Sequence, residues 1–207
     1  MLLSVNPINP QQRLLDRAVS VLKNDGVIIY PTDTVYGLGC SIFSKKAMAR
    51  ICMIKNRDPK KPMTFICSSE RQIQEYTQGI PTPVFKIIRR YLPGPYTFIF
   101  NAAKLVPQMM LTKRKTLGCR WPDHAIAVNL VETLGHPILS TSLLTSDEIL
   151  YDDPTSIHDK FKKQVDLVID GGTIFAEHST IVDFTTPTPE VVRQGKGETS
   201  WLEEIFI

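Results

Sequence analysis

The chain has 207 residues, 43% of them hydrophobic and 22% charged, a composition typical of soluble globular proteins that excludes disordered and fibrous classes. The net charge is only +3, but segment 45–122 holds 16 basic and 3 acidic side chains, a surplus of +13, while the remainder holds 8 basic and 18 acidic ones. This segregation indicates either a positive surface for a polyanion, such as nucleotide phosphates or RNA, or solvated surface cations.

The sequence lacks several features that mark secreted, membrane-spanning and metal-binding proteins. Residues 1–10 do not form a secretory signal, and no apolar run reaches the roughly 18–20 residues that cross a bilayer, so no membrane association is expected. The four cysteines, at positions 40, 52, 67 and 119, never form a CxxC pair, which predicts buried, reduced thiols in a cytoplasmic protein. The histidines are scattered, so no protein-ligated metal is expected.

Apolar periodicity and β-rich runs predict elements along the whole chain. In chain order they are a helix over 12–22, a strand over 27–30, a helix over 46–54, a strand over 63–67, a helix over 82–91, strands over 96–100 and 116–120, a helix over 124–134 closed by Gly135, and strands over 138–142, 165–169, 181–184 and 190–193. This irregular alternation predicts an α/β fold with a twisted, mixed parallel and antiparallel sheet flanked by helices. No repeat or flexible linker interrupts it, so a single domain over 1–207 is expected. The connection 185–189 is too short for a crossover helix and predicts an antiparallel pair.

Two segments have the composition of ligand-binding loops. In the segment 30–39, YPTDTVYGLG, small hydroxyl residues and two glycines follow a strand, and they would let backbone N–H groups approach a ligand closely. A tight structural turn explains the same pattern equally well. The segment 55–62, KNRDPKKP, places cations and an amide after a helix. These side chains could neutralise a triphosphate or form a solvated basic turn.

Further segments follow in a specific order: PGPYT at 93–97, TLGCR at 116–120, PILSTS at 137–142, DLVIDGG at 166–172, STIVD at 179–183 and VRQG at 192–195. With the two loops, this order resembles the YrdC/YciO family of threonylcarbamoyl-adenylate synthase-like proteins. The stretch KRKTLGCRWP followed by PILSTSLL resembles the YciO branch.

The resemblance implies a fold and an activity. The sheet would carry a concave, positively charged cavity. Family synthases combine L-threonine, bicarbonate and ATP, whose phosphates Mg²⁺ bridges, into threonylcarbamoyl-adenylate and pyrophosphate for the modification of tRNA. Binding of double-stranded RNA is also attributed to the family.

The resemblance also assigns residues to this site. The residues implied to contact threonine are Thr34, Arg120, Ser140 and Ser179, with Arg120 matching its carboxylate. Lys55 and Arg57 are implied to grip the ATP phosphates and to act in catalysis. The nucleotide site would be completed by Lys61, Thr116, Ser142 and Arg193.

The chain departs from the synthase pattern at three positions: Leu144 and Lys61 stand where asparagines are usual, and Ile66 stands where a histidine is usual. Losing two buried polar contacts would cost roughly a few kcal/mol of ligand binding. Three activities therefore stay open, namely the synthase reaction, hydrolysis of the adenylate, and binding of a nucleotide or RNA with little or no synthesis. The RNA alternative rests on cations outside the cavity: Lys86, Arg89, Arg90, Lys113, Arg114 and Lys115.

Overall fold

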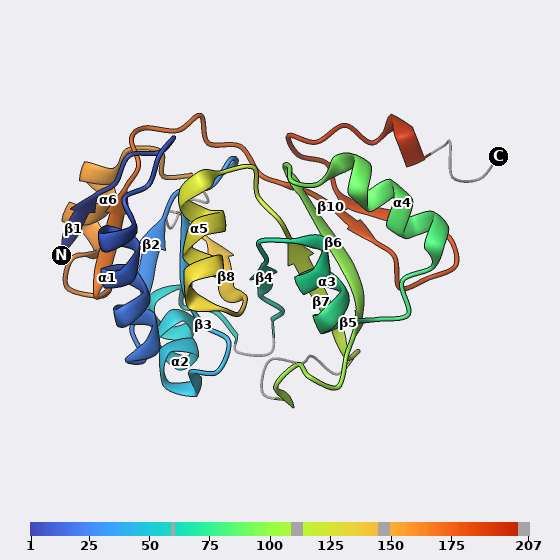
Figure 1. Ribbon diagram of the computed structural model, residues 1–207, viewed down its shortest axis with the longest axis horizontal. Helices are drawn as coiled ribbons and strands as arrows, with labels where there is room; N and C mark the ends of the chain where they lie inside the picture. The colour runs from blue at the N-terminus through green and yellow to red at the C-terminus, as the bar shows by residue number, and fades with distance from the viewer. Residues whose placement is uncertain (59–60, 109–113, 145–149, 203–207) are drawn as a thin grey trace.

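The computed structural model describes residues 1–58, 61–108, 114–144 and 150–202. They form one mixed β-sheet with helices packed against it (Figure 1). The strands are β1 (Leu2–Ser4), β2 (Ile28–Tyr30), β3 (Gly37–Ser41), β4 (Thr64–Ile66), β5 (Thr77–Gln78), β6 (Tyr96–Ala102), β7 (Thr116–Arg120), β8 (Ile138–Ser142), β9 (Leu167–Asp170), β10 (Thr180–Asp183) and β11 (Glu190–Arg193). The helices are α1 (Gln12–Lys23), α2 (Lys45–Ile54), α3 (Glu70–Tyr76), α4 (Thr82–Tyr91), α5 (Ala125–Leu134) and α6 (Pro154–Phe161).

The sheet mixes parallel and antiparallel neighbours, as the sequence predicts. Its strand order is β1-β9-β2-β3-β8-β4-β7-β6-β10-β11, and β5 pairs with β6 outside this path. Strand β9 runs parallel to β1 and β2, β4 to β7, and β6 to β10, while the other pairs are antiparallel. The short connection 185–189 joins β10 and β11 as antiparallel partners, which confirms that prediction.

The predicted helices and strands are present, with helix bounds within one residue and strand bounds within two. Gly135 follows α5 with φ = +84°, the left-handed conformation expected of a glycine C-cap. Five elements were not predicted from the sequence: β1, β3, β5, α3 and α6. Helix α3 has only seven residues, too few for a clear apolar periodicity. Helix α6 begins at the cap Asp153, whose carboxylate accepts a hydrogen bond from the Ser156 backbone N–H at 2.7 Å.

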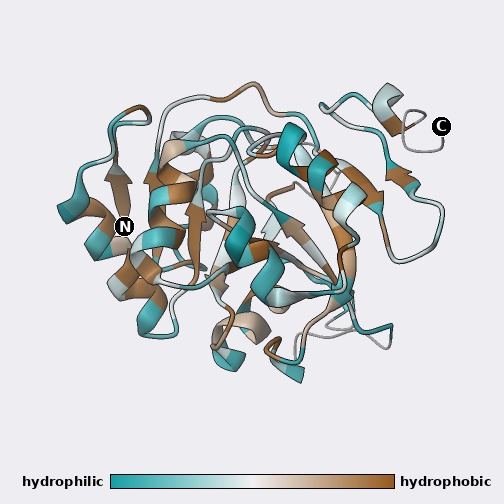
Figure 2. Cartoon of the chain, turned by 45° about the vertical axis from the view of Figure 1, so that its right-hand side comes forward, coloured by the Kyte–Doolittle hydropathy of each residue, from teal (hydrophilic) through white to brown (hydrophobic). Residues whose placement is uncertain are grey.

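Two clusters of buried apolar side chains cover the opposite faces of the sheet. Ile28 and Tyr30 of β2 pack in one cluster with α1 and α5, which lie side by side in Figure 1. Ile29 packs in the other cluster, with side chains from α2, α3, α4 and α6. Alternate residues of a strand point to opposite faces, so the two clusters are separated by the sheet. Figure 2 shows both hydrophobic and hydrophilic residues along these helices, as expected when one side of each is buried.

Candidate active site

Small and hydroxyl side chains occupy one face of the sheet where β8, β4 and β7 lie next to one another. Thr64 of β4 is in register with both Ser140 of β8 and Gly118 of β7. Leu139, next to Ser140 in β8, and Cys119, next to Gly118 in β7, point to the opposite face and belong to its apolar cluster. Because the side chains of this row are short, they leave space above the sheet, and a cavity lies there.

The cavity draws its walls from five strands and two connecting segments. Its lining residues are Thr32, Val35, Gly37, Thr64, Ile66, Thr97, Arg120, Ser140, Thr141, Ser142 and Ser179. Apart from Val35, Gly37, Ile66 and Arg120, each of these residues carries a hydroxyl group. Hydroxyls both donate and accept hydrogen bonds, so the lining suits a small ligand that presents donors and acceptors together.

Arg120 is the charged residue of this lining, and it forms a buried ion pair. Its Nη2 lies 2.5 Å from Oδ1 of Asp33, and the two side chains are only 6% and 12% exposed. Arg120 Nε and Asp33 Oδ2 are also buried, and neither has a hydrogen-bond partner among the described residues. A buried polar atom without a partner is costly, so the pair keeps one donor and one acceptor that a ligand would satisfy.

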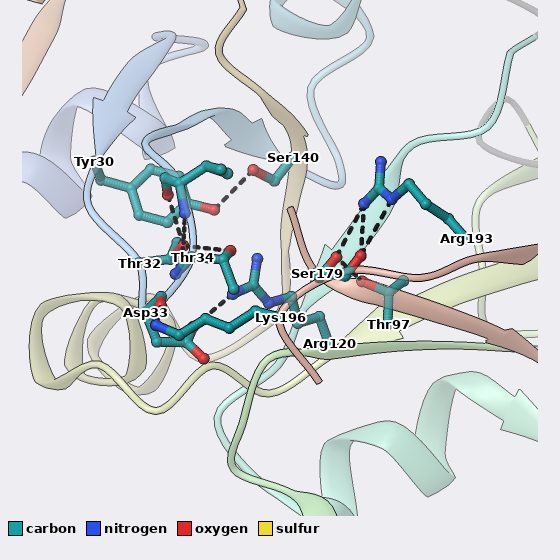
Figure 3. A network of polar contacts seen from close by, with 11 residues as sticks. Tyr30, Thr32, Asp33, Thr34, Thr97, Arg120, Ser140, Ser179, Arg193 and Lys196 are labelled. Atoms are coloured by element: carbon teal, nitrogen blue, oxygen red, sulfur yellow. Dashed lines mark hydrogen bonds and ion pairs between the residues drawn. The ribbon is translucent and has the colours of Figure 1, made fainter. Parts of the chain in front are cut away.

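Tyr30 is fully buried next to the cavity and supports the lining residue Ser140. Its hydroxyl donates a hydrogen bond to Ser140 Oγ at 2.9 Å (Figure 3), and burial raises its pKa, which keeps it a donor. A Cβ on Gly37 would lie 3.2 Å from the Tyr30 ring, and one on Gly39 only 2.9 Å from it. The two glycines, which the sequence analysis placed in a ligand loop, lie in β3 and give room to this ring. Gly37 also lines the cavity, so a close approach of a ligand to this segment stays a prediction.

The loop before β3 is held by Thr32. Its hydroxyl donates to the carbonyl of Val35 at 2.6 Å and accepts from the Val35 N–H at 3.1 Å. The hydroxyl of Thr34 is directed at Thr32, at 3.3 Å, and Thr34 is fully buried. Thr34, a predicted threonine contact, therefore lies behind the lining, and Thr32 supplies the hydroxyl at the surface of the cavity.

Ser179 closes the opposite wall and connects the cavity to Arg193. Its hydroxyl lies 3.0 Å from that of Thr97, and Arg193 donates to the Ser179 hydroxyl at 3.2 Å and to its carbonyl at 2.9 Å (Figure 3). Burial, and then the charge of Arg120, lower the pKa of Arg193. Arg193 forms no ion pair with any described carboxylate. The charge of Arg120 thus acts on Arg193, and an anionic ligand near both guanidinium groups would offset this repulsion.

Arg57 reaches the rim of the cavity at Thr141, and Lys55 lies close enough to Arg57 to feel its charge. Arg57 Nη1 donates to Thr141 Oγ1 at 3.1 Å, and Nη2 donates to the carbonyl of Pro62 at 2.9 Å. Burial lowers the pKa of both cations, and for Lys55 the charge of Arg57 lowers it further. These two cations are therefore partly desolvated before any ligand binds, a condition that strengthens their attraction for phosphate.

The structure brings only part of the predicted site together. Arg120, Ser140, Ser142 and Ser179 line the cavity, and Ile66 lines it where the family pattern has a histidine. Six other predicted contacts are not among the lining residues: Thr34, Lys55, Arg57, Lys61, Thr116 and Arg193. Arg57 and Arg193 nevertheless hydrogen-bond to the lining residues Thr141 and Ser179. Lys61 is exposed ahead of β4, and Thr116 lies on the cavity face of β7, two residues beyond Gly118.

Several lining residues were missed by the sequence analysis, namely Thr32, Thr64, Thr97 and Thr141, together with Asp33, which pairs with Arg120. A signal for some of them was present. In TLGCR and in ILSTS, small or polar residues alternate with apolar ones, the period-two pattern of a strand with one polar face.

The predicted outer cations fall into two groups. The exposed members are Lys86, Arg89 and Arg90 on α4 and Arg114 and Lys115 before β7. Lys113 lies outside the described residues. Arg89 is neutralised by Glu70, with Nε–Oε2 at 3.0 Å. The carbonyl of Lys115 accepts a hydrogen bond from Ala102 at the end of β6, whereas α4 leads into its start, so the two groups are near opposite ends of this strand.

No three histidine, cysteine, aspartate or glutamate side chains among the described residues gather closely enough to hold a metal ion. None of the described helices is both long and apolar enough to span a bilayer. All four cysteines are free and buried, as predicted.

The chain is similar to proteins of one family over most of its length. The family model Sua5/YciO/YrdC, described as telomere recombination, matches residues 20–195. The uncharacterized protein YciO of Escherichia coli K12 is 43% identical over 94% of this chain and 95% of its own. Its crystal structure gives a TM-score of 0.92 over 97% of this chain and 98% of that one, at 42% identity.

A second group of similar proteins has a described activity. A threonylcarbamoyl-AMP synthase of Pyrococcus abyssi is 29% identical over 96% of this chain and 60% of its own length. The crystal structure of P. abyssi Sua5 complexed with L-threonine gives a TM-score of 0.91 at 25% identity, covering 99% of this chain and 60% of that one. The cavity face described above belongs to a fold shared with both groups.

Proposed function

Because this chain belongs to the Sua5/YciO/YrdC family, which includes threonylcarbamoyl-AMP synthases, we propose that it binds L-threonine, bicarbonate and ATP and forms threonylcarbamoyl-AMP and pyrophosphate. The product would supply the threonylcarbamoyl group for tRNA modification. The observation that carries the proposal is the hydroxyl-lined cavity around Arg120. The similarity to YciO over nearly the whole of both chains agrees with the predicted YciO branch.

The threonine would occupy the part of the cavity between Arg120 and Ser140. Its carboxylate accepts hydrogen bonds from the Arg120 guanidinium, whose Nε has no other described partner. Its hydroxyl exchanges hydrogen bonds with Ser140, which Tyr30 holds in place, or with Ser179. A site that hydrogen-bonds a substrate hydroxyl rejects analogues that lack it, so selection of threonine over alanine would follow.

The ATP phosphates would lie toward the rim, where the other cations are. Arg57, with Lys55 near it, approaches from the Thr141 side and Arg193 from the Ser179 side. Mg²⁺ would enter with the nucleotide and bridge its phosphates, as it usually does without a dedicated protein cage. In the reaction, a carbamate oxygen of the substrate bonds to the α-phosphorus, and the bond from that phosphorus to pyrophosphate breaks. The enzyme contributes positioning and neutralisation of the phosphate charge.

Hydrolysis of a bound adenylate is the alternative that the lining keeps open. Ile66 puts a buried apolar side chain into the wall where the synthase pattern has a histidine. An apolar wall gives ATP one polar contact fewer, whereas the threonine end of the cavity keeps its hydroxyls. Such a site would still hold threonylcarbamoyl-AMP, and water would then release AMP.

One experiment separates these outcomes. The purified chain is incubated with ATP, Mg²⁺, bicarbonate and labelled threonine, and pyrophosphate and threonylcarbamoyl-AMP are measured. Preformed threonylcarbamoyl-AMP is supplied in a parallel reaction, and AMP is measured. Threonine-dependent pyrophosphate release supports synthesis, and AMP release from the preformed adenylate alone supports hydrolysis. A folded protein that does neither, and whose melting temperature neither ligand raises, would exclude the proposal.

RNA binding is a second candidate, favoured by the exposed cations on α4 and before β7. No acidic residue occurs between Glu75 and Asp123, and of these cations Arg89 is paired with Glu70. Affinity for double-stranded RNA or tRNA should fall steeply as salt rises, because phosphate contacts release counterions. It should also weaken in a variant with alanine at 113, 114 and 115. An affinity that neither salt nor this variant changes would count against RNA binding.

A further inference from the structure

Asp33 is the carboxylate beside the cavity, and the threonine and phosphate contacts proposed above do not use it. One of its oxygens, Oδ1, is bound by Arg120, while Oδ2 is buried without a described partner. Its position is fixed from two directions. Lys196 Nζ donates to the Asp33 carbonyl at 2.9 Å, and the backbone N–H of Glu177 donates to the carbonyl of Thr34 at 2.9 Å.

The free atoms of the ion pair match an amino acid in its zwitterionic form. Arg120 Nε can donate to a carboxylate, and Asp33 Oδ2 can accept from an ammonium group. The two side chains are joined at 2.5 Å, so a ligand bound beside Arg120 lies close to both of them. Hydroxyls supply the remaining polar contacts of the cavity, and they carry no charge to balance an ammonium group.

The chemistry at that nitrogen calls for a proton acceptor. A threonine ammonium has no lone pair and cannot attack bicarbonate until it loses a proton. We propose that Asp33 binds the α-ammonium group of threonine through Oδ2 and accepts this proton, an inference that rests on the proposed function.

The ammonium proton moves to Asp33 Oδ2, and the nitrogen lone pair forms a bond to the carbon of bicarbonate. A carbon–oxygen bond of bicarbonate breaks, and the leaving hydroxide departs as water with a second proton from the nitrogen. The product is the carbamate that attacks ATP, and Asp33 then returns its proton to solvent.

Other ionisable groups lie near Asp33. Arg120 and Lys196 are cations, and Asp123 and His124 lie at the start of α5. Burial lowers the pKa of His124, and the nearby charge of Asp33 opposes that shift. His124 Nδ1 has no described hydrogen-bond partner, so His124 is the competing proton acceptor, and the test includes it.

Binding to the unaltered protein gives the first test, and it needs no catalysis. Threonine is compared with 3-hydroxybutyrate, which keeps the carboxylate and the hydroxyl but lacks the ammonium group, by calorimetry at pH 7. Loss of a charge-assisted hydrogen bond should weaken binding about 10- to 100-fold. Equal affinity for the two compounds would overturn the inference and leave the proposed function intact. Binding of neither compound would instead count against the proposed function.

Variants give the second test. Asp33→Asn should abolish the preference for threonine over 3-hydroxybutyrate and lower kcat for threonine-dependent pyrophosphate release about 10²- to 10⁴-fold at pH 7. Its remaining activity should rise about tenfold per pH unit as free threonine loses its proton, while the unaltered protein shows a flatter profile. Asp123→Asn, which removes an exposed carboxylate nearby, is the matched control and should match the unaltered protein.

Two results would refute the assignment to Asp33. One is an Asp33→Asn variant that stays folded with the original preference and pH profile. The other is a His124→Gln variant that shows the steep pH profile while Asp33→Asn does not, which would give the role to His124. If Asp33→Asn does not fold, because Arg120 loses its counterion, the comparison of threonine with 3-hydroxybutyrate on the unaltered protein still decides.

Discussion

Filling the cavity from its floor should remove ligand binding and leave the fold intact. Gly118 lies in β7 between two lining side chains, and a Cβ there would meet Thr97 Cγ2 at 3.4 Å and Thr64 Oγ1 at 3.5 Å. These are ordinary van der Waals distances, so Gly118→Ala fits without displacing a neighbour. It should stabilise the fold by about 0.4–1 kcal/mol, because the unfolded chain loses freedom. Gly118→Val places two further methyl groups into the space a ligand needs.

Gly39 of β3 provides the matched control. A Cβ at this glycine would lie 2.7 Å from Ile138 Cγ2 and 2.9 Å from Tyr30 Cε1. Both atoms belong to fully buried side chains, which cannot move aside freely. Gly39→Ala should therefore cost about 1–3 kcal/mol, and the melting temperature should fall by roughly 2–4 °C for each kcal/mol.

The assay is thermal unfolding of the three variants with and without threonine and ATP. Gly118→Val should melt close to the unaltered protein and lose most of the ligand-dependent increase in melting temperature. Gly39→Ala should melt lower and keep that increase. If Gly118→Val binds threonine normally, the ligand does not occupy this cavity. If Gly118→Ala destabilises more than Gly39→Ala, the packing argument is wrong.

Two further predictions concern stability. Ser140→Ala leaves the buried Tyr30 hydroxyl without its acceptor and should lower the free energy of unfolding by about 1–3 kcal/mol. Adding Tyr30→Phe to this variant should lower it little further. Strictly additive losses in denaturant unfolding would refute the coupling between the two side chains. Burial alone would raise the pKa of Asp166, but hydrogen bonds from Arg50 and from the Val27 N–H lower it overall. The stability from this lowered pKa is present above the ordinary aspartate pKa of about 3.9 and is lost as the pH falls through the folded value. Asp166→Asn should therefore lower the free energy of unfolding by about 1 kcal/mol at pH 7, a modest amount because the Arg50–Asp166 pair is partly exposed. A stability difference between this variant and the unaltered protein that is undiminished near pH 2 would contradict this assignment.

The sequence alone determined the elements whose pattern is local. Helix α4 begins and ends where its apolar periodicity does, and α5 ends at the glycine that takes the left-handed conformation. These signals come from neighbouring residues, so no long-range information is needed. The motif order also indicated the family to which the chain belongs, since it samples nearly the whole chain.

Elements that depend on tertiary contacts escaped sequence reasoning. Strand β3 contains two glycines, which are poor strand formers, and the motif that holds it was interpreted as a ligand loop. It becomes a strand because it lies between β2 and β8 and because the Tyr30 ring takes the space where side chains would be. That environment exists only after the sheet has formed.

The cavity likewise combines residues that the sequence indicated with residues that only the fold brings together. The sequence indicated Arg120, Ser140 and Ser179, and the alternation within β7 and β8 marks a polar face. It could not reveal that Asp33, 87 positions earlier in the chain, pairs with Arg120, or that Thr97 meets Ser179. Strand order and register bring these residues together, and long-range pairing leaves no mark on the residues beside each partner. The sequence therefore indicated which polar and charged residues belong to the site, whereas the tertiary structure decided which of the charges are paired.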